Sequence, residues 1–277
     1  MAFDYELIIK PKKGYVYLDF KEIWAYKDLF YFLAWRDIKV RYKQAVMGVV
    51  WALFQPLITM IIFTVLFGRL AKMPSDGIPY PVFVFLGLLP WQFFSSVLTQ
   101  SSASLVLEKN LITKIYFPRI ILPASYALSC FLDFLIAFFI LGLLMAWYKI
   151  NVTMSLFLIP VLVLLIVLNS IGFGLWLSAL NVRYRDIQYV VPFMLQIGMF
   201  VTPVIYPLSM AGDKVWIKNM HMLNPMTGVI ESFRACVTGA QAIPWGLLGI
   251  SAVVGFVIFI TGAVYFKKVE RFFADIV

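Results

Sequence analysis

The sequence predicts an all-α polytopic membrane protein, because charge is missing from it in long blocks. Hydrophobic residues make up 62% of the 277 residues, far above the roughly 45–50% apolar content of soluble domains. An α-helix rises about 1.5 Å per residue, so about 20 apolar residues cross the hydrocarbon core of a bilayer. Each block is long enough to cross. The blocks without Asp, Glu, Lys or Arg are 44–68, 77–107, 150–182, 187–212 and 235–266, and a further apolar block, 120–148, contains one charge, Asp133.

Residues 1–45 are predicted to form a cytoplasmic amino terminus that ends in an interfacial amphipathic helix. The first 43 residues carry nine Lys and Arg, and such an excess favours the cytoplasmic side of a membrane. Aromatic side chains on one face of a helix favour the depth of the lipid headgroups. The residues that share this face are Tyr31, Trp35, Ile38 and Tyr42.

Residues 46–277 are predicted to form one transmembrane domain of six helices. The crossings are expected at about 46–68, 79–105, 120–148, 152–180, 187–208 and 243–266. The remaining segment, 209–242, combines charges with Gly and Pro breaks, and it begins and ends on the outer side. We expect two short re-entrant helices in the outer leaflet, since irregular backbone at that depth must be buried in protein or line water. A plain extracellular loop is the alternative.

Loops on alternate sides differ in positive charge, and this difference predicts the orientation. The segments assigned to the cytoplasm carry 17 Lys and Arg, whereas those assigned to the outside carry 6. The positive-inside rule therefore places both termini in the cytoplasm of a multi-pass protein of the cytoplasmic (inner) membrane. The net charge of +9 mostly reflects this excess, which faces anionic membrane lipids. It does not indicate nucleic-acid binding.

No catalytic or nucleotide-binding site is expected in this chain. A P-loop requires a Gly-Lys pair, and no glycine here precedes a lysine. One histidine and two cysteines are too few for a zinc cage, and no acidic cluster is present to hold Mg²⁺ and a diphosphate. We therefore expect no enzymatic activity, no catalytic residue, no metal and no cofactor in the chain itself.

Two acidic residues in apolar parts of the chain need partners. Asp133 is the one acid inside a predicted crossing, where an ionisable residue is either paired or functional. Pairing with a neighbouring helix is the favoured interpretation. Glu231 and Arg234 lie three residues apart, a spacing that brings side chains together on a helix. We expect these two to neutralise each other.

Neutral polar and aromatic side chains mark the first, second and fifth crossings. Such stripes either bond helices to one another or line a path for a polar molecule. Amides, hydroxyls and aromatic rings suit sugars better than ions. The fourth crossing carries a small-residue surface for helix packing, formed by Ser170, Gly174 and Ser178. Its partner is either the same chain or a second copy.

Four short strings occur in order along the chain. They are Trp-Arg-Asp-Ile-Lys-Val-Arg-Tyr at 35–42, Leu-Pro-Trp-Gln-Phe-Phe at 89–94, Asn-Val-Arg-Tyr-Arg-Asp at 181–186 and Leu-Asn-Pro-Met-Thr at 223–227. With these strings, the chain from about residue 20 to its end resembles the ABC-2 type permeases that export polysaccharides such as O-antigen. The resemblance implies a second copy of the chain, two copies of a separate ATPase that binds ATP and Mg²⁺, and a lipid-diphosphate-linked glycan as substrate.

The resemblance also suggests roles for particular residues. The ATPase-coupling residues would be Glu108, Lys109, Asn110, Leu111, Ile112 and Lys114, with Arg183, Arg185 and Asp186 as a second cytoplasmic contact. The candidates for lining a channel between two copies are Trp51, Gln55, Thr59, Trp91, Phe94, Gln196, Phe200 and Tyr206. The candidates for an outer gate within 209–242 are Asn224, Pro225, Glu231 and Arg234.

Two other classes of function stay open on the sequence. One is an ABC-2 permease for teichoic acid, a drug or a small lipid. The other is a membrane-embedded glycosyl or prenyl transferase that acts on a lipid-linked sugar. A neighbouring gene for an ATPase would favour a permease, and its absence would favour the transferase.

Overall fold

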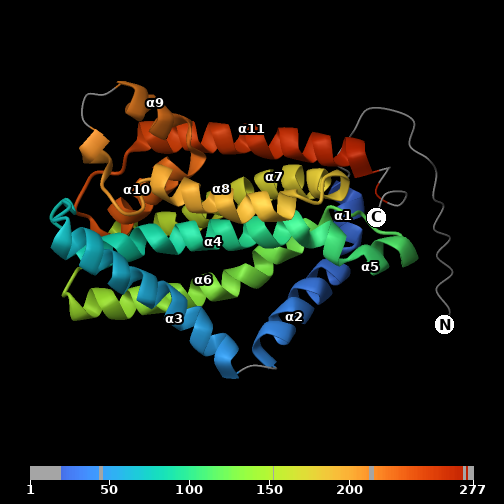
Figure 1. The fold of residues 1–277 in the computed structure, drawn as a ribbon, viewed down its shortest axis with the longest axis horizontal. Helices are drawn as coiled ribbons and strands as arrows, with labels where there is room; N and C mark the ends of the chain where they lie inside the picture. Colours follow the sequence, from blue (N-terminus) through green and yellow to red (C-terminus); the bar gives the residue numbers. More distant parts are fainter. Residues whose placement is uncertain (1–19, 44–45, 152, 212–214, 271–272, 274–277) are drawn as a thin grey trace.

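The computed structural model describes residues 20–43, 46–151, 153–211, 215–270 and 273, which form a bundle of α-helices (Figure 1). No β-strand occurs within these ranges. The helical elements are α1 (Phe20–Ala25), α2 (Lys27–Lys43), α3 (Val46–Phe63), η1 (Thr64–Leu70), α4 (Tyr80–Leu107), α5 (Lys109–Lys114), α6 (Ile121–Trp147), η2 (Met154–Leu158), α7 (Ile159–Arg183), α8 (Ile187–Val201), η3 (Leu208–Ala211), α9 (Val215–Leu223), α10 (Pro225–Thr238) and α11 (Trp245–Glu270).

Helix α4 is the centre of the bundle. It packs against α6 and α7 and also contacts α3, α8 and α10, and most of its residues between Val82 and Leu105 are buried. A Cβ added to Gly174 of α7 would lie 2.7 Å from the Cβ of Ser101 in α4. Ser170 and Ser178 on the same surface of α7 are buried. The small-residue surface of α7 therefore packs within the chain, against α4.

Helices α7 and α11 approach each other backbone to backbone. A Cβ added to Gly262 of α11 would lie 2.4 Å from the carbonyl oxygen of Gly172 in α7. One added to Gly255 would lie 2.2 Å from Oδ1 of Asn169. Close backbone approach through small residues is how helices gain packing energy in lipid, where burial of apolar surface gives little.

The predicted all-α polytopic fold is confirmed. Among the described residues, four helical segments are long and apolar enough to cross a bilayer, and two more apolar segments are shorter. The four are Tyr80–Leu107, Ile121–Trp147, Met154–Arg183 and Trp245–Glu270, and the two are Phe54–Leu70 and Ile187–Val201. The count of six crossings stays a prediction.

Two predicted crossings have different bounds in the structure. The one expected over 187–208 leaves helical geometry after Val201, where Thr202 has an extended backbone with ψ of 143°. The one expected from residue 152 starts with the 3₁₀ turn η2, and α7 begins at Ile159 with a proline in its first turn. Proline is tolerated there because that N–H has no partner within the helix.

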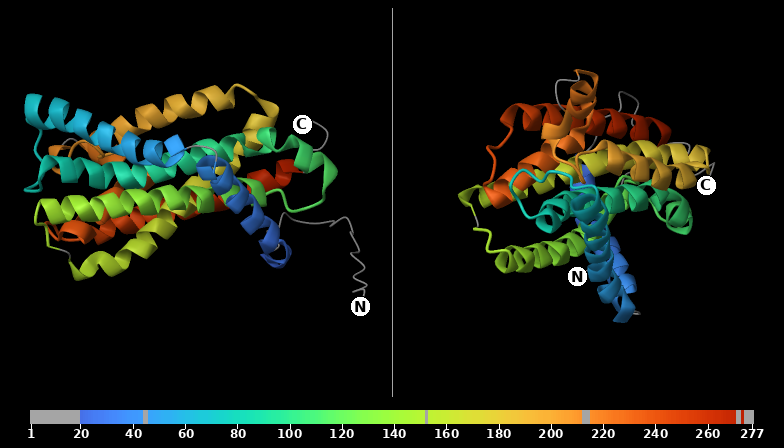
Figure 2. Two further views of the ribbon diagram at one scale, coloured as in Figure 1. Left: turned by 90° about the horizontal axis from the view of Figure 1, so that it is seen from below. Right: turned by 60° about the vertical axis from the view of Figure 1, so that its left-hand side comes forward.

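The two ends of the bundle differ in what they carry (Figure 1). We call the end with α1, α5 and the turn at 184–186 the basal end, and the last turn of α11 lies there as well. The distal end has the loops 71–79 and 239–244. Helices α2 and α3 diverge from the bundle as the two arms of a V (Figures 1 and 2). The first and last described helices thus share one end, as the predicted orientation expects.

The segment 209–242 contains η3, α9 and α10, so the prediction of two short helices is confirmed. Helix α10 is buried from Pro225 to Val237 and packs against α4, α7 and α11. A plain loop is therefore wrong for this segment. Its location in the outer leaflet of a membrane stays a prediction.

Candidate functional site

Helix α10 is a well-capped helix at the distal end. The side chain of Asn224 accepts a hydrogen bond of 3.0 Å from the Met226 amide, and Pro225 occupies the first helical position. Gly239 ends the helix in the left-handed conformation, with φ of 62°, which glycine adopts without a steric penalty. Asn224 before α10, Pro225 at its start and Gly239 after it therefore fix both ends of the helix.

Glu231 and Arg234 form an ion pair of 2.9 Å inside the protein, so the predicted pairing is confirmed. Arg234 also donates a hydrogen bond of 2.6 Å to the Val204 carbonyl, and its guanidinium lies 3.8 Å from the ring centroid of Phe83. Gly87 makes room for this arrangement, because a Cβ there would lie 2.7 Å from the guanidinium. A buried charge needs such compensation, since removing it from water is costly.

The irregular segment 202–207 is held by polar side chains from three directions. Besides Arg234, the Tyr80 hydroxyl donates to the Ile205 carbonyl at 2.8 Å, and Asn224 donates to the Thr202 hydroxyl at 2.8 Å. Non-helical backbone at membrane depth requires partners of this kind. The end of α8 is therefore tied directly to α4 and to the start of α10.

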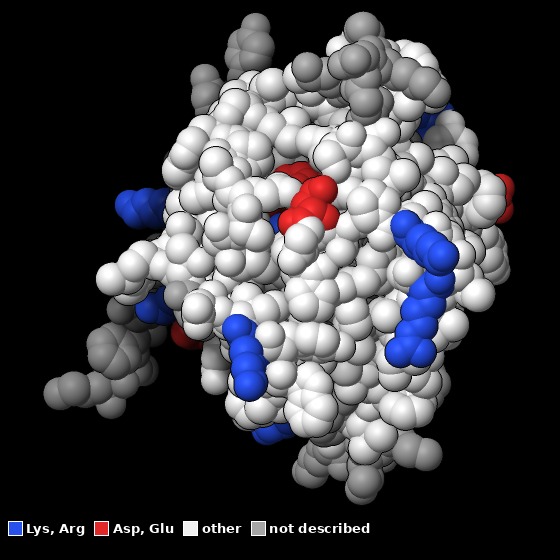
Figure 3. Space-filling model, turned by 90° about the vertical axis from the view of Figure 1, so that its left-hand side faces the viewer, with Lys and Arg blue, Asp and Glu red and all other residues white. Residues whose placement is uncertain are grey.

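Asp76 links the loops of the distal end. Its carboxylate accepts hydrogen bonds from Ser209 at 3.0 Å and from Gln241 at 2.8 Å. Figure 3 shows this end, with acidic side chains in a hollow near its middle and Lys and Arg toward its edges. His221 lies below the surface on α9, and burial lowers its pKa. The candidate gate residues Asn224 and Arg234 thus bind the segment 202–207, and Asp76 links the loops beside it.

An apolar pocket of about 250 Å³ lies between α4, α7, α8 and the start of α10. Trp91 and Phe94 line it and are only 6% and 5% exposed. Gly198 of α8 allows the Trp91 ring to fit, because a Cβ there would lie 2.9 Å from the ring. Two of the predicted channel-lining residues therefore pack inside a single chain, behind α8.

The other predicted channel residues lie nearer the surface. Gln55 on α3, and Gln196 and Phe200 on α8, are exposed. Thr59 and Tyr206 are half-buried, and the Tyr206 hydroxyl bonds the last carbonyls of α8. The side chain of Trp51 falls outside what the structure describes. The structure thus divides the predicted set into an exposed group on α3 and α8 and a buried group behind them.

Asp133 is paired, as the sequence favoured, and its partners come from α2. Arg41 forms an ion pair with its carboxylate, and the Tyr42 hydroxyl donates to it. Arg41 also donates to Gln100 of α4 at 2.8 Å. Asp133 lines a polar pocket of about 130 Å³ between α3, α4 and α6, together with Gln55, Gln92 and Ser96.

The predicted coupling segment is a short helix at the basal end. Helix α5 buries Ile112 and exposes Lys109, Asn110 and Lys114, so its outer face is free to meet a partner. Leu111 is half-buried. Glu108, at the junction of α4 and α5, is bonded to Arg36 of α2, and this hydrogen bond raises the pKa of Arg36. The second predicted contact, Arg183, Arg185 and Asp186, is exposed as well.

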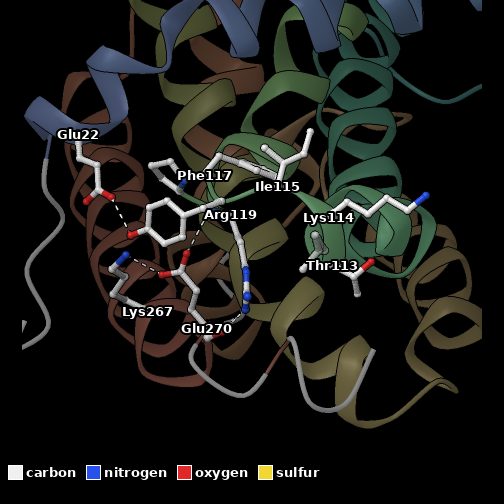
Figure 4. Close-up of a pocket in the computed structure, with 11 residues that line it drawn as sticks. Glu22, Thr113, Lys114, Ile115, Phe117, Arg119, Lys267 and Glu270 are labelled. Atoms are coloured by element: carbon white, nitrogen blue, oxygen red, sulfur yellow. Dashed lines mark hydrogen bonds and ion pairs between the residues drawn. The ribbon is translucent and has the colours of Figure 1, made fainter. Parts of the chain in front are cut away.

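A cavity of about 500 Å³ opens beside α5 at the basal end (Figure 4). Its wall contains a chain of polar contacts. Tyr116 donates to Glu22 at 3.2 Å, the Arg119 amide donates to Glu270 at 3.0 Å, and Lys267 pairs with Glu270 at 2.6 Å. Burial is the main reason why the pKa of Tyr116 is raised. These contacts join α1, the loop after α5 and the end of α11.

The sequence did not indicate the partners that α2 supplies. Its aromatic and basic residues predicted a membrane-interface helix, yet Arg36 reaches Glu108 at the α4–α5 junction and Arg41 reaches Asp133 on α6. The contacts of Tyr80 and Asp76 at the distal end were also missed, because they join residues far apart in the chain. The sequence offered one signal for these pairs. Arg36 and Arg41 precede two acids, Glu108 and Asp133, that lie next to or within apolar segments.

These features define a polytopic helical membrane protein whose polar side chains gather in pockets, on exposed helix faces and at the distal end. The chain belongs to the ABC-2 type transporter family, which it matches over residues 28–238. The resemblance drawn from the four sequence strings is therefore confirmed.

Three relatives cover most of the chain. An O-antigen export system permease protein RfbA of Myxococcus xanthus is 32% identical over 78% of this chain and 82% of its own length. One of Klebsiella pneumoniae with the same name is 29% identical over 90% and 95%, respectively. The polysialic acid transport protein KpsM of Escherichia coli is 28% identical over 73% and 78%.

Proposed function

We propose that this chain is the membrane permease of an ABC transporter that exports a lipid-diphosphate-linked polysaccharide of the O-antigen type across the cytoplasmic membrane. The names of its relatives support a polysaccharide as cargo. In this proposal two copies of the chain form the pathway, and two copies of a separate ATPase supply the energy. Both termini then lie in the cytoplasm, at the basal end.

The exposed face of α8 is the observation that carries the proposal. Val191 is the buried residue of this helix, whereas Gln188 and Gln196 are exposed together with Tyr189, Phe193 and Phe200. An amide exposed to lipid has no hydrogen-bond partner, so such side chains face protein or a water-filled cavity. We infer that this face of α8, with Gln55 of α3, meets a second copy and lines the path of the glycan.

The closed network at the distal end fits an outer gate in this scheme. Asn224, Pro225, Glu231 and Arg234 hold α10 against the end of α8. Opening the path requires the contacts from Arg234 to Val204 and from Asn224 to Thr202 to break, whereas Glu231 and Arg234 lie on one helix and move together.

The energy must come from another chain, since this sequence has no Gly-Lys pair for a P-loop. We infer that the ATPase binds the exposed face of α5, with the Arg183–Asp186 turn as a second contact. ATP and Mg²⁺ are then held by the ATPase.

Reversing two charges on α5 tests this function. The double variant Lys109→Glu/Lys114→Glu is expected to lower the surface polysaccharide of cells that rely on it, and to lower the amount of ATPase that copurifies, because rim charges tune association. The matched control is Lys72→Glu/Lys149→Glu, which makes the same charge change at exposed positions of the distal end. A double variant that retains both the ATPase and normal surface polysaccharide would refute the assignment of α5.

A further inference from the structure

Helix α2 packs mainly against α6, with further contacts to α1 and α3. Among its described side chains, Leu33 and Ala34 are the buried ones, with 2% and 1% exposed. Leu33 packs in the apolar cluster of the basal end, and Leu29 and Phe30 pack against that cluster. The residues that follow them turn away from this cluster, and Trp35, Lys39 and Val40 are exposed. In the second half of α2, the side chains of Arg36 and Arg41 bind acidic side chains elsewhere in the bundle.

The first of these contacts is made at the start of α5. Arg36 bonds Glu108, the residue between α4 and α5, and also Asp37 beside it at 2.8 Å. Glu108 is the first residue after α4, and its carbonyl accepts hydrogen bonds from the Leu111 and Ile112 amides of α5. A displacement of α5 must therefore move Glu108, and with it the guanidinium of Arg36.

The second contact is made halfway along α6. Arg41 pairs with Asp133, and it lies about 7 Å further along the axis of α2 than Arg36. Asp133 is about 18 Å from the first residue of α6, which is the middle of that helix. The Tyr42 hydroxyl and Gln100 complete the site around the same carboxylate and guanidinium. One rigid helix thus connects the α4–α5 junction with the interior of the bundle.

Asp133 also forms part of the wall of the polar pocket between α3, α4 and α6. Gln55 of this wall is on α3, the arm of the V that follows α2 directly. A shift of Arg41 would therefore change the pocket from two sides, through Asp133 and through the start of α3.

We propose that α2 is a transmission strut, in which Arg36 takes up the movement of α5 and Arg41 passes it to Asp133 and to the pocket beside α3. This proposal rests on the proposed function, because it takes α5 as the contact of the ATPase. It assigns Arg36, Glu108, Arg41 and Asp133 as positioning residues for transport. They touch neither ATP nor the path along α8.

A charge swap tests the first contact. In the full complex with the ATPase, Arg36→Glu is expected to lower surface polysaccharide roughly tenfold, a coupling effect of ordinary size, while ATP hydrolysis and ATPase copurification stay at the wild-type level. Glu108→Arg is expected to lower surface polysaccharide by a similar factor. The double variant Arg36→Glu/Glu108→Arg restores the pair and is expected to recover most of the export. Lys39→Glu is the matched control, since it makes the same change on an exposed residue of α2.

The second contact has its own variant. Asp133→Asn keeps the shape of the side chain but removes the charge that Arg41 meets, and it is expected to lower export with normal ATPase binding. Melting temperatures of the purified complexes are measured in parallel. Rescue of the melting temperature without rescue of export by the double swap would overturn the strut, as would normal export by Asp133→Asn. Absence of ATPase from the wild-type complex would instead refute the proposed function.

Discussion

Arg234→Met is expected to destabilise the protein by about 3–5 kcal/mol, because it leaves a buried carboxylate without its partner. Glu231 is only 7% exposed, so water cannot replace the guanidinium. The Val204 carbonyl loses its donor at the same time. The measurement is the unfolding midpoint of the purified protein in detergent, together with the amount that accumulates in membranes.

The double variant Glu231→Gln/Arg234→Met separates the effect of an unpaired Glu231 carboxylate from the effect of losing the donor to the Val204 carbonyl. It removes both charges, so it is expected to be markedly more stable than Arg234→Met alone. Lys149→Met is the control for loss of one positive charge at an exposed site. If Arg234→Met unfolds at the wild-type midpoint, or if the double variant is no better than the single one, the buried pair does not stabilise the distal end.

Gly262→Ala is expected to cost about 1–3 kcal/mol, the usual range for overpacking a tight contact. The added methyl group would lie 2.4 Å from the Gly172 carbonyl oxygen. The obstacle is backbone, so α7 and α11 must move apart. The same unfolding measurement in detergent checks the effect.

Gly249→Ala is the matched control for this substitution. It lies on the same helix, α11, and nothing is within 4 Å of the added Cβ. Its unfolding midpoint is expected to equal that of the wild type or to lie slightly above it. Equal midpoints for the two alanine variants would show that α7 and α11 tolerate a wider spacing than the structure implies.

The fold class could be predicted from the sequence because it depends on the length of the charge-free blocks. Charge-free blocks long enough to cross a bilayer leave helices as the natural solution for the backbone. The pair Glu231 and Arg234 was also predictable, since helical spacing brings residues three apart together. Asp133 was expected to have a partner, because an acid inside a membrane crossing is usually paired. The sequence could not identify that partner on α2, because the contact depends on tertiary packing.

The division of the predicted channel residues could not be read from the sequence. Trp91, Phe94, Gln196 and Phe200 all belong to polar or aromatic stripes, and a stripe has the same pattern whether it packs a neighbour or faces a channel. The structure distinguishes them by what covers them. Trp91 and Phe94 lie behind α8, whereas Gln196 and Phe200 are exposed.

The end of α8 was missed for a related reason. The apolar run continues through residues 202–207, so hydropathy gives no sign that the helix stops. The helix ends because Pro203 disfavours a helical backbone at Thr202. Arg234, Tyr80 and Asn224 then supply partners for the non-helical backbone. Such partners are visible only once α4, α8 and α10 are placed together.

The central claim is that a polysaccharide passes along the exposed face of α8. A photoreactive amino acid at position 196, in cells that rely on this variant for export, tests it most directly. Position 164 is the control, because Leu164 is an exposed residue of α7 and faces lipid in our account. After illumination, the purified chain is analysed by mass spectrometry for attached sugar. We predict sugar adducts at position 196 that disappear when the ATPase is inactivated, and none at position 164. Adducts at neither position, or equally at both, while export continues would contradict the account.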